Sequence, residues 1–440
     1  MSYHIVNARL VNEGTVSTGD LSVARGRILG VNVPAPPGAD VIDAAGAYLL
    51  PGMIDDQVHF REPGFEHKAT IETESRAAVA GGITSYLEMP NCAPQTVTAT
   101  ALEDKHARAA ARSTANYGFY LGATNDNLEA IRAVDQRLAC GIKIFMGAST
   151  GNMLVEDERT LDGIFAASPI LIATHCEHTP TILANEAAAA ARYGDDVPFT
   201  EHPNIRSADA CYRSSNLAVE LAKRHDAQLH VLHITTAREL DLFEAGHLAD
   251  KRITAEACVH HLFFDDTAYP SKGASIKCNP AIKSAADQQA LWTAVNDDRI
   301  DVIATDHAPH TAAEKARPYA QAPSGLPLVQ HALLTLFEHV RAGTFSVEKV
   351  VEKTAHAPAR LFGIVERGFI REGYWADLVM VDPTSRSRDT PIYSKCGWSP
   401  FNDVVFGSRV RMTWVNGELR YRDGRFQDGA RGRALEFERP

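Results

Sequence analysis

The sequence predicts an α/β fold, namely a (β/α)8 TIM-like barrel with a small β-sandwich domain formed from both termini. Three observations support this prediction. Strand-like and helix-like segments alternate through the middle of the 440-residue chain. Short strand-like segments separated by Gly and Pro occur at both ends. Polar residues with the chemistry of metal ligands follow several apolar strands, where barrels of this kind hold their active sites.

The two ends of the chain, residues 1–52 and 364–440, are predicted to form one composite β domain. N-terminal strands are expected at Ile5-Val6, Leu21–Val23, Arg27–Leu29 and Val41-Ile42. C-terminal strands are expected at Ala376–Val381 and Val410–Val415, the second followed by the turn Asn416-Gly417. Since both ends carry the same kind of segment, the middle of the chain is expected to be a single inserted domain.

Residues 53–363 are predicted to form the barrel. With the segment at 53–58, the strand candidates are Thr84–Glu88, Gly118–Ala123, Ile142–Phe145, Ile170–Ala173, Leu229–Ile234, Ile253–Ala257 and Val302–Ala304. The helix candidates are 70–80, 101–112, 179–192, 207–225, 236–246, 285–296 and 327–342. This alternation indicates a parallel sheet with right-handed crossovers. An open doubly wound sheet is the alternative, but no GxGxxG follows a strand, which weakens its dinucleotide-binding form.

Composition limits the possible functions. The net charge of −11, from 44 basic and 55 acidic residues, gives no support for binding to nucleic acid or an anionic membrane. No apolar run is long enough to span a bilayer, and no secretory signal is expected at Met1–Val6. Seven scattered cysteines without a CxxC motif are typical of reduced thiols in a cytoplasmic protein.

Residues of the metal-ligand type gather at predicted strand ends. Gln57 and His59 are two apart, so their side chains lie on the same face of a strand. His175 and His233 each follow an apolar strand, although a single His there is more often a hydrogen-bonded core residue. Asp306 ends the last predicted strand and is also a candidate helix N-cap. Together these nitrogen and oxygen donors suit a divalent metal of the zinc type.

Lys143 follows the same pattern at the end of another strand. A protonated lysine is a poor metal ligand, but a lysine that reacts with carbon dioxide becomes a carbamate with two oxygens that can bridge two cations. Taken alone, Lys143 is better explained as a surface residue or as the partner of a carboxylate. Arg61 and Asn91 are candidate substrate contacts, since a guanidinium can hold a carboxylate in a fork. A salt bridge and a turn are their simpler explanations.

An ordered set of motifs resembles dihydroorotases of the amidohydrolase superfamily. The motifs are Gln57–Gly64, His67-Lys68, Gly81–Thr84, Met89–Asn91, Gly141–Lys143, Leu229–Ile234, Glu256–Phe264 and Thr305–Lys315. The similarity runs in unbroken order from about residue 50 to 365, and the terminal segments resemble the superfamily's composite β domain.

The resemblance implies a role for each matching residue. His59, carbamylated Lys143 and Asp306 would hold one Zn²⁺ ion, and Lys143, His175 and His233 a second, with a bridging hydroxide and Asp306 as general base and acid. Arg61, Asn91 and His310 would hold a substrate carboxylate, and Asn279 would contact a pyrimidine ring. Ser149 and Thr150 match a mobile catalytic loop.

One residue departs from the family pattern. The first strand of the family normally reads His-x-His, and Gln57 stands in the first His position. A neutral amide oxygen is a weaker zinc ligand than imidazole. Three interpretations stay open: Gln57 ligates through its oxygen, the first site binds metal weakly or stays empty, or the chain is an inactive scaffold homologue.

The leading functional prediction is reversible closure of N-carbamoyl-L-aspartate to (S)-dihydroorotate in pyrimidine biosynthesis. One alternative is another cyclic amidohydrolase of the allantoinase or dihydropyrimidinase type, whose substrates lack the ring carboxylate. The other is a scaffold subunit that supports aspartate transcarbamoylase. A small-molecule substrate, a homodimer and association with aspartate transcarbamoylase are the expected partners.

Overall fold

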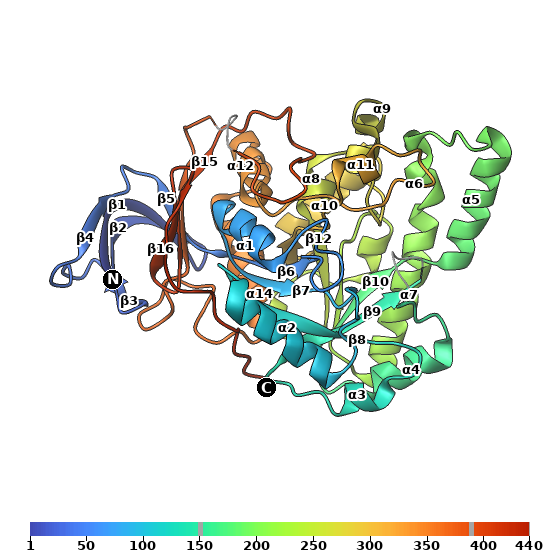
Figure 1. Cartoon of the computed structure of the whole chain (residues 1–440), viewed down its shortest axis with the longest axis horizontal. Helices are drawn as coiled ribbons and strands as arrows, with labels where there is room; N and C mark the ends of the chain where they lie inside the picture. Colours follow the sequence, from blue (N-terminus) through green and yellow to red (C-terminus); the bar gives the residue numbers. More distant parts are fainter. Residues whose placement is uncertain (148–152, 387–390, 440) are drawn as a thin grey trace.

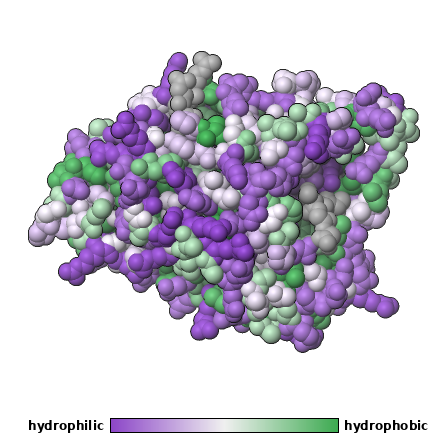
Figure 2. Space-filling view, in the orientation of Figure 1, coloured by the Kyte–Doolittle hydropathy of each residue, from purple (hydrophilic) through white to green (hydrophobic). Residues whose placement is uncertain are grey.

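The computed structural model describes residues 1–147, 153–386 and 391–439. Figure 1 shows a sheet of terminal strands at one end of the molecule and a larger α/β unit at the other. The face shown in Figure 2 is predominantly hydrophilic. In the described residues no helix is long and apolar enough to cross a membrane. All seven cysteines are free, as the sequence predicts.

Eight parallel strands form the barrel and pair in the order of the sequence. They are β6 (Met53–Val58), β7 (Ile83–Glu88), β8 (Asn116–Gly122), β9 (Ala139–Met146), β10 (Ile172–Cys176), β11 (Leu229–Val231), β12 (Ile253–Cys258) and β13 (Val302–Ala304). The first and last strands meet just beyond their ends, where Val58 bridges His307 and the His59 N–H donates to the His307 carbonyl at 2.7 Å. The predicted barrel is therefore confirmed, and it is nearly closed.

Helices follow most of the strands and pack on the outside of the barrel (Figure 1). The longer ones are α1 (Ile71–Ala80), α2 (Ala99–Arg112), α4 (Glu158–Ala167), α5 (Thr179–Tyr193), α7 (Ala208–His225), α10 (Ala285–Asn296) and α12 (Ala332–Ala342). The short helices are α3 (Leu128–Arg132), α6 (His202–Ile205), α8 (Val259–Phe263), α9 (Tyr269–Lys272), α11 (Ala312–Lys315), α13 (Val347–Val351) and α14 (Ala357–Leu361). Ser or Thr side chains cap the N-termini of α1, α2, α7 and α10, which fixes where these helices begin.

Two predicted helices are wrong in extent. The segment 236–246 holds only a 3₁₀ turn at Glu239–Leu242, because the Glu239 carboxylate accepts hydrogen bonds from Thr236 and Ser215 and holds the chain in a local turn. The helix predicted from residue 327 begins at Ala332, since the backbone N–H groups of Leu328 and Val329 donate to His307 Nδ1. Helix α4, which contains Gly163, was not predicted.

The terminal strands form one nine-stranded sheet, and this confirms the predicted β-sandwich. Its strands are β1 (Ser2–Asn12), β2 (Thr15–Ala24), β3 (Arg27–Val31), β4 (Asp40–Asp43), β5 (Tyr48–Pro51), β14 (Leu378–Asp382), β15 (Arg409–Val415), β16 (Glu418–Arg422) and β17 (Arg425–Phe426). Antiparallel pairing of β5 with β14 joins the two ends of the chain. Tyr3 and Trp414 lie on strands that are not neighbours in the sheet, yet their ring centroids are 6.3 Å apart. The sheet therefore folds over its own apolar core.

Candidate active site

A cavity lies at the carboxyl ends of the barrel strands, where this architecture presents its functional side chains. Most of the residues predicted from the sequence line it: Gln57, His59, Arg61, Asn91, Lys143, His175, His233, Asn279 and Asp306. The cavity is also lined by four residues that were not predicted: Phe145, Ala308, Ser324 and Gly325. Ser149 and Thr150 lie outside the described residues.

His59, Gln57 and Asp306 form one half of the site. His59 Nε2 and Gln57 Nε2 lie 3.0 and 3.2 Å from the same oxygen, Asp306 Oδ1. His59 Nδ1 lies 2.7 Å from Asn91 Oδ1. Burial lowers the pKa of His59, and a neutral ring has one proton, which cannot be donated to both oxygens. The ring nitrogen that does not carry the proton keeps a lone pair, which a cation can take. Asp306 is not a helix cap, since Thr311 caps the next helix.

His175 and His233 form the other half, with 3.0 Å between His175 Nδ1 and His233 Nε2. Burial lowers the pKa of both imidazoles, so each presents a neutral ring. Glu177 Oε2 lies 3.1 Å from His175 Nε2 and orients that ring. Burial would raise the pKa of Glu177, but Arg206 and His175 lower it to about 2, so this carboxylate is ionised. A neutral imidazole with a carboxylate behind it, as at His175, is the usual state of a metal-binding histidine.

Lys143 lies on β9 within the cavity wall and is only 1% exposed. Its ammonium stands 4.7 Å from the centroid of the Phe145 ring and has no hydrogen bond or ion pair among the described residues. Burial lowers the pKa of Lys143 to about 8, although Asp306 and Glu256 act in the opposite direction. The explanation of Lys143 as a surface residue is wrong. Its amine is buried among the candidate ligands and is partly neutral near physiological pH.

Three site residues have left-handed backbone conformations, which residues other than Gly rarely adopt. The φ angles are 68° at Arg61, 40° at His233 and 51° at Asp306. Each residue follows the last pairs of a barrel strand, so the unusual backbone turns its side chain into the cavity. Such strain is found mainly where function requires a particular side-chain direction.

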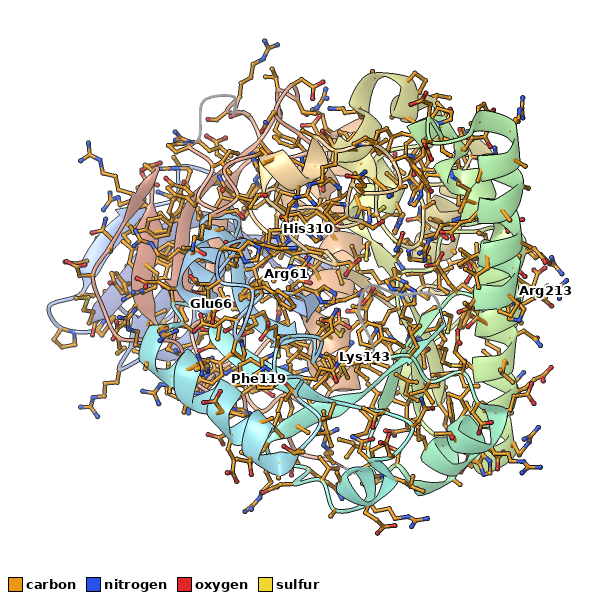
Figure 3. All side chains as sticks on the ribbon, turned by 45° about the vertical axis from the view of Figure 1, so that its right-hand side comes forward. Arg61, Glu66, Phe119, Lys143, Arg213 and His310 are labelled. Carbon is orange, nitrogen blue, oxygen red and sulfur yellow. The ribbon has the colours of Figure 1, made fainter. Side chains whose placement is uncertain are left out.

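Arg61, which lines the cavity, lies next to His310, which does not (Figure 3). Arg61 Nε donates to the Pro309 carbonyl at 3.0 Å, and Arg61 Nη2 lies 3.0 Å from His310 Nε2. Burial lowers the pKa of Arg61 to about 10, which leaves the guanidinium charged at neutral pH. Asn279 Oδ1 is buried and has no hydrogen-bond partner among the described residues.

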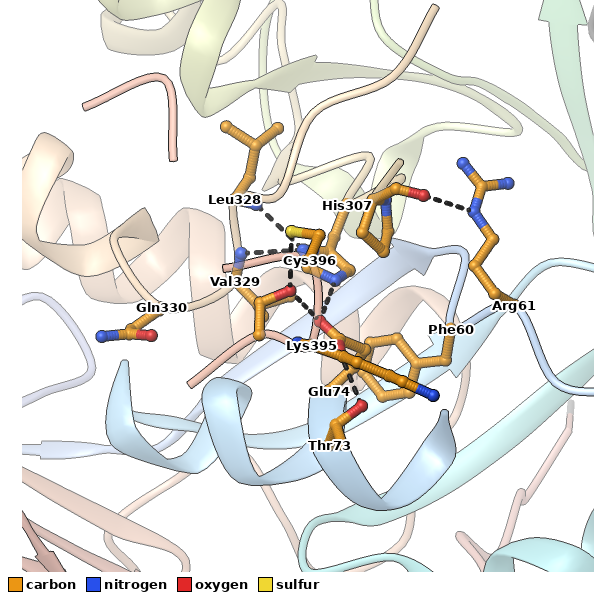
Figure 4. A network of polar contacts seen from close by, with 12 residues as sticks. Phe60, Arg61, Thr73, Glu74, His307, Leu328, Val329, Gln330, Lys395 and Cys396 are labelled. Carbon is orange, nitrogen blue, oxygen red and sulfur yellow. Dashed lines mark hydrogen bonds and ion pairs between the residues drawn. The ribbon is translucent and has the colours of Figure 1, made fainter. Parts of the chain in front are cut away.

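A buried polar network fixes the chain that follows Asp306 (Figure 4). His307 Nε2 donates to Glu74 Oε2 at 2.8 Å, and His307 Nδ1 accepts from the Leu328 N–H at 2.9 Å. Glu74 also accepts from the backbone N–H of Lys395, at 3.0 Å. The network joins α1, the end of β13 and the C-terminal segment, so it holds the main chain beside Asp306 rigidly.

Two groups of potential metal ligands lie elsewhere in the described residues, and neither was predicted. In the first, His230 Nε2 lies 3.2 Å from Asp56 Oδ2 and 3.8 Å from Glu256 Oε2. Burial would lower the pKa of His230, but these carboxylates raise it to about 9, so the group forms an internal ion pair. His230 is therefore held by these carboxylates and does not line the cavity. The second group joins Cys258 with the buried His260 and His261.

Glu177 and Glu256 are the supporting residues that sequence reasoning missed. Glu177 orients His175, and Glu256 Oε1 accepts from the His233 backbone N–H at 2.9 Å. Each is an acidic residue in or just after an apolar strand, two positions beyond another polar residue. That placement could have indicated a supporting role, because an acidic residue on a buried strand requires a partner.

A barrel with imidazole, carboxylate and lysine side chains converging at the carboxyl ends of its strands is the architecture of a hydrolase that uses bound metal. The chain matches the amidohydrolase family over residues 48–420 and belongs to that family. It is 37% identical to a dihydroorotase of Halobacterium salinarum over 86% of this chain and 87% of that protein. It is 32% identical to an allantoinase of Bacillus velezensis, with 99% and 98% covered.

Among solved structures, the L-hydantoinase (dihydropyrimidinase) of Arthrobacter aurescens superimposes with a TM-score of 0.93 at 25% identity. The superposition covers 99% of each chain. These relatives have names that point to different cyclic substrates, so they support a hydrolase and leave the substrate open.

Proposed function

We propose that this protein is a dihydroorotase, which interconverts N-carbamoyl-L-aspartate and (S)-dihydroorotate. The observation that carries the proposal is the buried, charged Arg61, which lies beside His310 and lines the same cavity as the candidate metal ligands. A guanidinium taken out of water in this way favours a ligand that brings a negative charge, and a carboxylate matches its fork of donors.

The donor set fits zinc. His59 and Asp306 would hold one ion and His175 and His233 another, with Lys143 bridging them as a carbamate. The fit is supported by the 3.0 Å approach of the His59 ring to the Asp306 carboxylate and by the neutral imidazoles of the second pair. When bound, zinc supplies Lewis acidity, which polarises an amide carbonyl and makes water more acidic.

The chain's own residues supply positioning and proton transfer. Asp306 Oδ1 lies at the centre of the first half of the site, where its carboxylate can take a proton from water and return it to the ring nitrogen. Arg61 and His310 hold the substrate carboxylate. Asn91 orients His59 through its Oδ1, and its Nδ2 is free of partners among the described residues to donate to the substrate. The unpartnered Asn279 Oδ1 can accept from a ring N–H.

Allantoin and hydantoin rings lack a carboxylate, so a site built for them has no use for a buried Arg61. The test is turnover by zinc-loaded protein of dihydroorotate, N-carbamoyl-L-aspartate, allantoin and hydantoin, with Asp306→Asn as the inactive control. We expect dihydroorotate and its open form to have by far the highest kcat/KM. Faster hydrolysis of allantoin or hydantoin would refute the proposal, and absence of turnover with all four would favour the scaffold alternative.

A further inference from the structure

Lys68 lies behind the cavity wall, where it contacts His310 without lining the cavity itself. Its ammonium nitrogen is 3.0 Å from His310 Nδ1 and 3.0 Å from Glu314 Oε1. The Lys68 side chain is 15% exposed, and His310 is 2% exposed. The ammonium is therefore held between one imidazole nitrogen and one carboxylate.

Glu314 is itself fixed in place. Its Oε2 accepts from the Thr311 N–H at 2.9 Å in the capping box of α11. Burial would raise the pKa of Glu314, but the bonds from Thr311 and Lys68 lower it to about 2. An ionised Glu314 keeps a positive charge on Lys68 and holds the ammonium against the ring.

The contact determines which nitrogen of His310 carries the proton. An ammonium can only donate, so His310 Nδ1 must accept from Lys68. Burial, together with the charges of Arg61 and Lys68, strongly lowers the pKa of His310, so the ring is neutral. Its single proton is then on Nε2, which donates to the Ser324 carbonyl at 3.0 Å.

The position of the proton on His310 also determines whether Arg61 can bond to that ring. Arg61 Nη2 lies 3.0 Å from His310 Nε2, but both groups are donors and cannot bond to each other. The guanidinium arm therefore keeps a donor that no protein acceptor takes, on a residue that lines the cavity. A carboxylate in the cavity can accept from it.

We propose that Lys68 is a specificity-determining positioning residue, which fixes the proton of His310 on Nε2 and so keeps Arg61 available to a substrate carboxylate. This inference rests on the proposed function. Without the ammonium, His310 Nδ1 would face Glu314 Oε2, now 4.0 Å away, and this carboxylate would draw the proton to Nδ1. Nε2 would then accept from Arg61, and this donor would be withdrawn from the substrate.

The test is Lys68→Met in the full-length, zinc-loaded protein, with His67→Gln as the matched control. His67 is the neighbouring residue, lies 3.8 Å from the same Glu314 carboxylate, and is 61% exposed. We expect Lys68→Met to raise KM for dihydroorotate by about 10- to 100-fold, the effect of losing a hydrogen bond to a charged group, with kcat changed little. The control should match the wild type. An unchanged KM in Lys68→Met, or a fall in kcat alone, would overturn the inference.

A second measurement does not depend on turnover. Nitrogen-15 NMR of histidine-labelled protein, with His310 assigned from a His310→Gln variant, reports the protonated ring nitrogen directly. We expect a proton on Nε2 in the wild type and on Nδ1 in Lys68→Met. A wild-type proton on Nδ1 overturns the inference even if the enzyme is active. Failure of the wild type to turn over dihydroorotate refutes the proposed function, while the NMR result still decides the role of Lys68 in setting the tautomer.

Discussion

Replacing Gln57 by His is expected to tighten metal binding at the site formed by His59, Lys143 and Asp306. In the structure the Gln57 amide donates through Nε2 to Asp306 Oδ1 at 3.2 Å, and its oxygen faces the Cys258 thiol at 3.7 Å. To ligate through oxygen, the amide must turn over and lose its bond to Asp306. An imidazole at this position needs no such exchange.

The size of the effect follows from that lost bond. A hydrogen bond to a charged group contributes about 1.5–3 kcal/mol, which corresponds to about 10- to 150-fold in affinity. We therefore expect the first site of the wild type to bind zinc more weakly than the site at His175 and His233 by about this factor. The Gln57→His variant should recover most of the difference.

The assay is a zinc titration against a competing chelator, with bound metal per chain and activity measured at each point. Gln57→Leu is the matched control, because it removes the amide at similar size. If Gln57 only bonds to Asp306, the Leu variant should bind zinc at least as well as the wild type. Since Gln57 is 1% exposed, a Gln57→His variant that does not accept the ring is repeated with Cys258→Ala. Two equally tight sites in the wild type would refute the reasoning.

Four further outcomes are expected. Lys143→Ala should abolish activity, with partial rescue by short carboxylic acids; full activity without additives would contradict the bridging role. Because burial lowers the pKa of Lys143 to about 8, the neutral amine rises from about one tenth at pH 7 to about nine tenths at pH 9, and carbon-13 NMR should show carbamate in metal-free protein increasing over that range. Arg61→Met should lower kcat/KM for dihydroorotate by about 30-fold or more, the loss of a buried charged pair, and unchanged efficiency would exclude the carboxylate assignment. Removal of metal by a chelator should stop turnover and added zinc should restore it, whereas an active metal-free protein would exclude zinc dependence.

The elements of the fold were predictable wherever burial is periodic. The barrel strands are apolar runs of a few residues, and the amphipathic helices between them have clear capping residues such as Thr98 and Ser207. The failure at 236–246 has a local cause. The pattern there suits a helix, but the Glu239 carboxylate bonds to the hydroxyls of Thr236 and Ser215, and such side-chain contacts leave no trace in the periodicity of the sequence.

Residues at strand ends could be predicted as a set, because the carboxyl ends of parallel strands meet at one face. The contacts between them could not. Lys68 and His310 are 242 positions apart, and their relation depends on how two loops pack across the barrel mouth. Glu177 and Glu256 lie beside predicted ligands, yet only the structure shows that one orients a ring and the other holds a backbone N–H.

Gln57 shows where sequence reasoning stops. The sequence gives the substitution of an amide for an imidazole and leaves three interpretations. The geometry favours weak binding at the first site, because the amide nitrogen, not the oxygen, faces Asp306. The residues around Gln57 weaken the scaffold interpretation. His175 and His233 keep neutral rings. Arg61, His233 and Asp306 have left-handed backbone conformations that place their side chains in the cavity. Positive φ angles occur at other non-Gly residues too, but these three come from three different barrel strands and all bring a side chain to the same cavity. That convergence is what a working site requires.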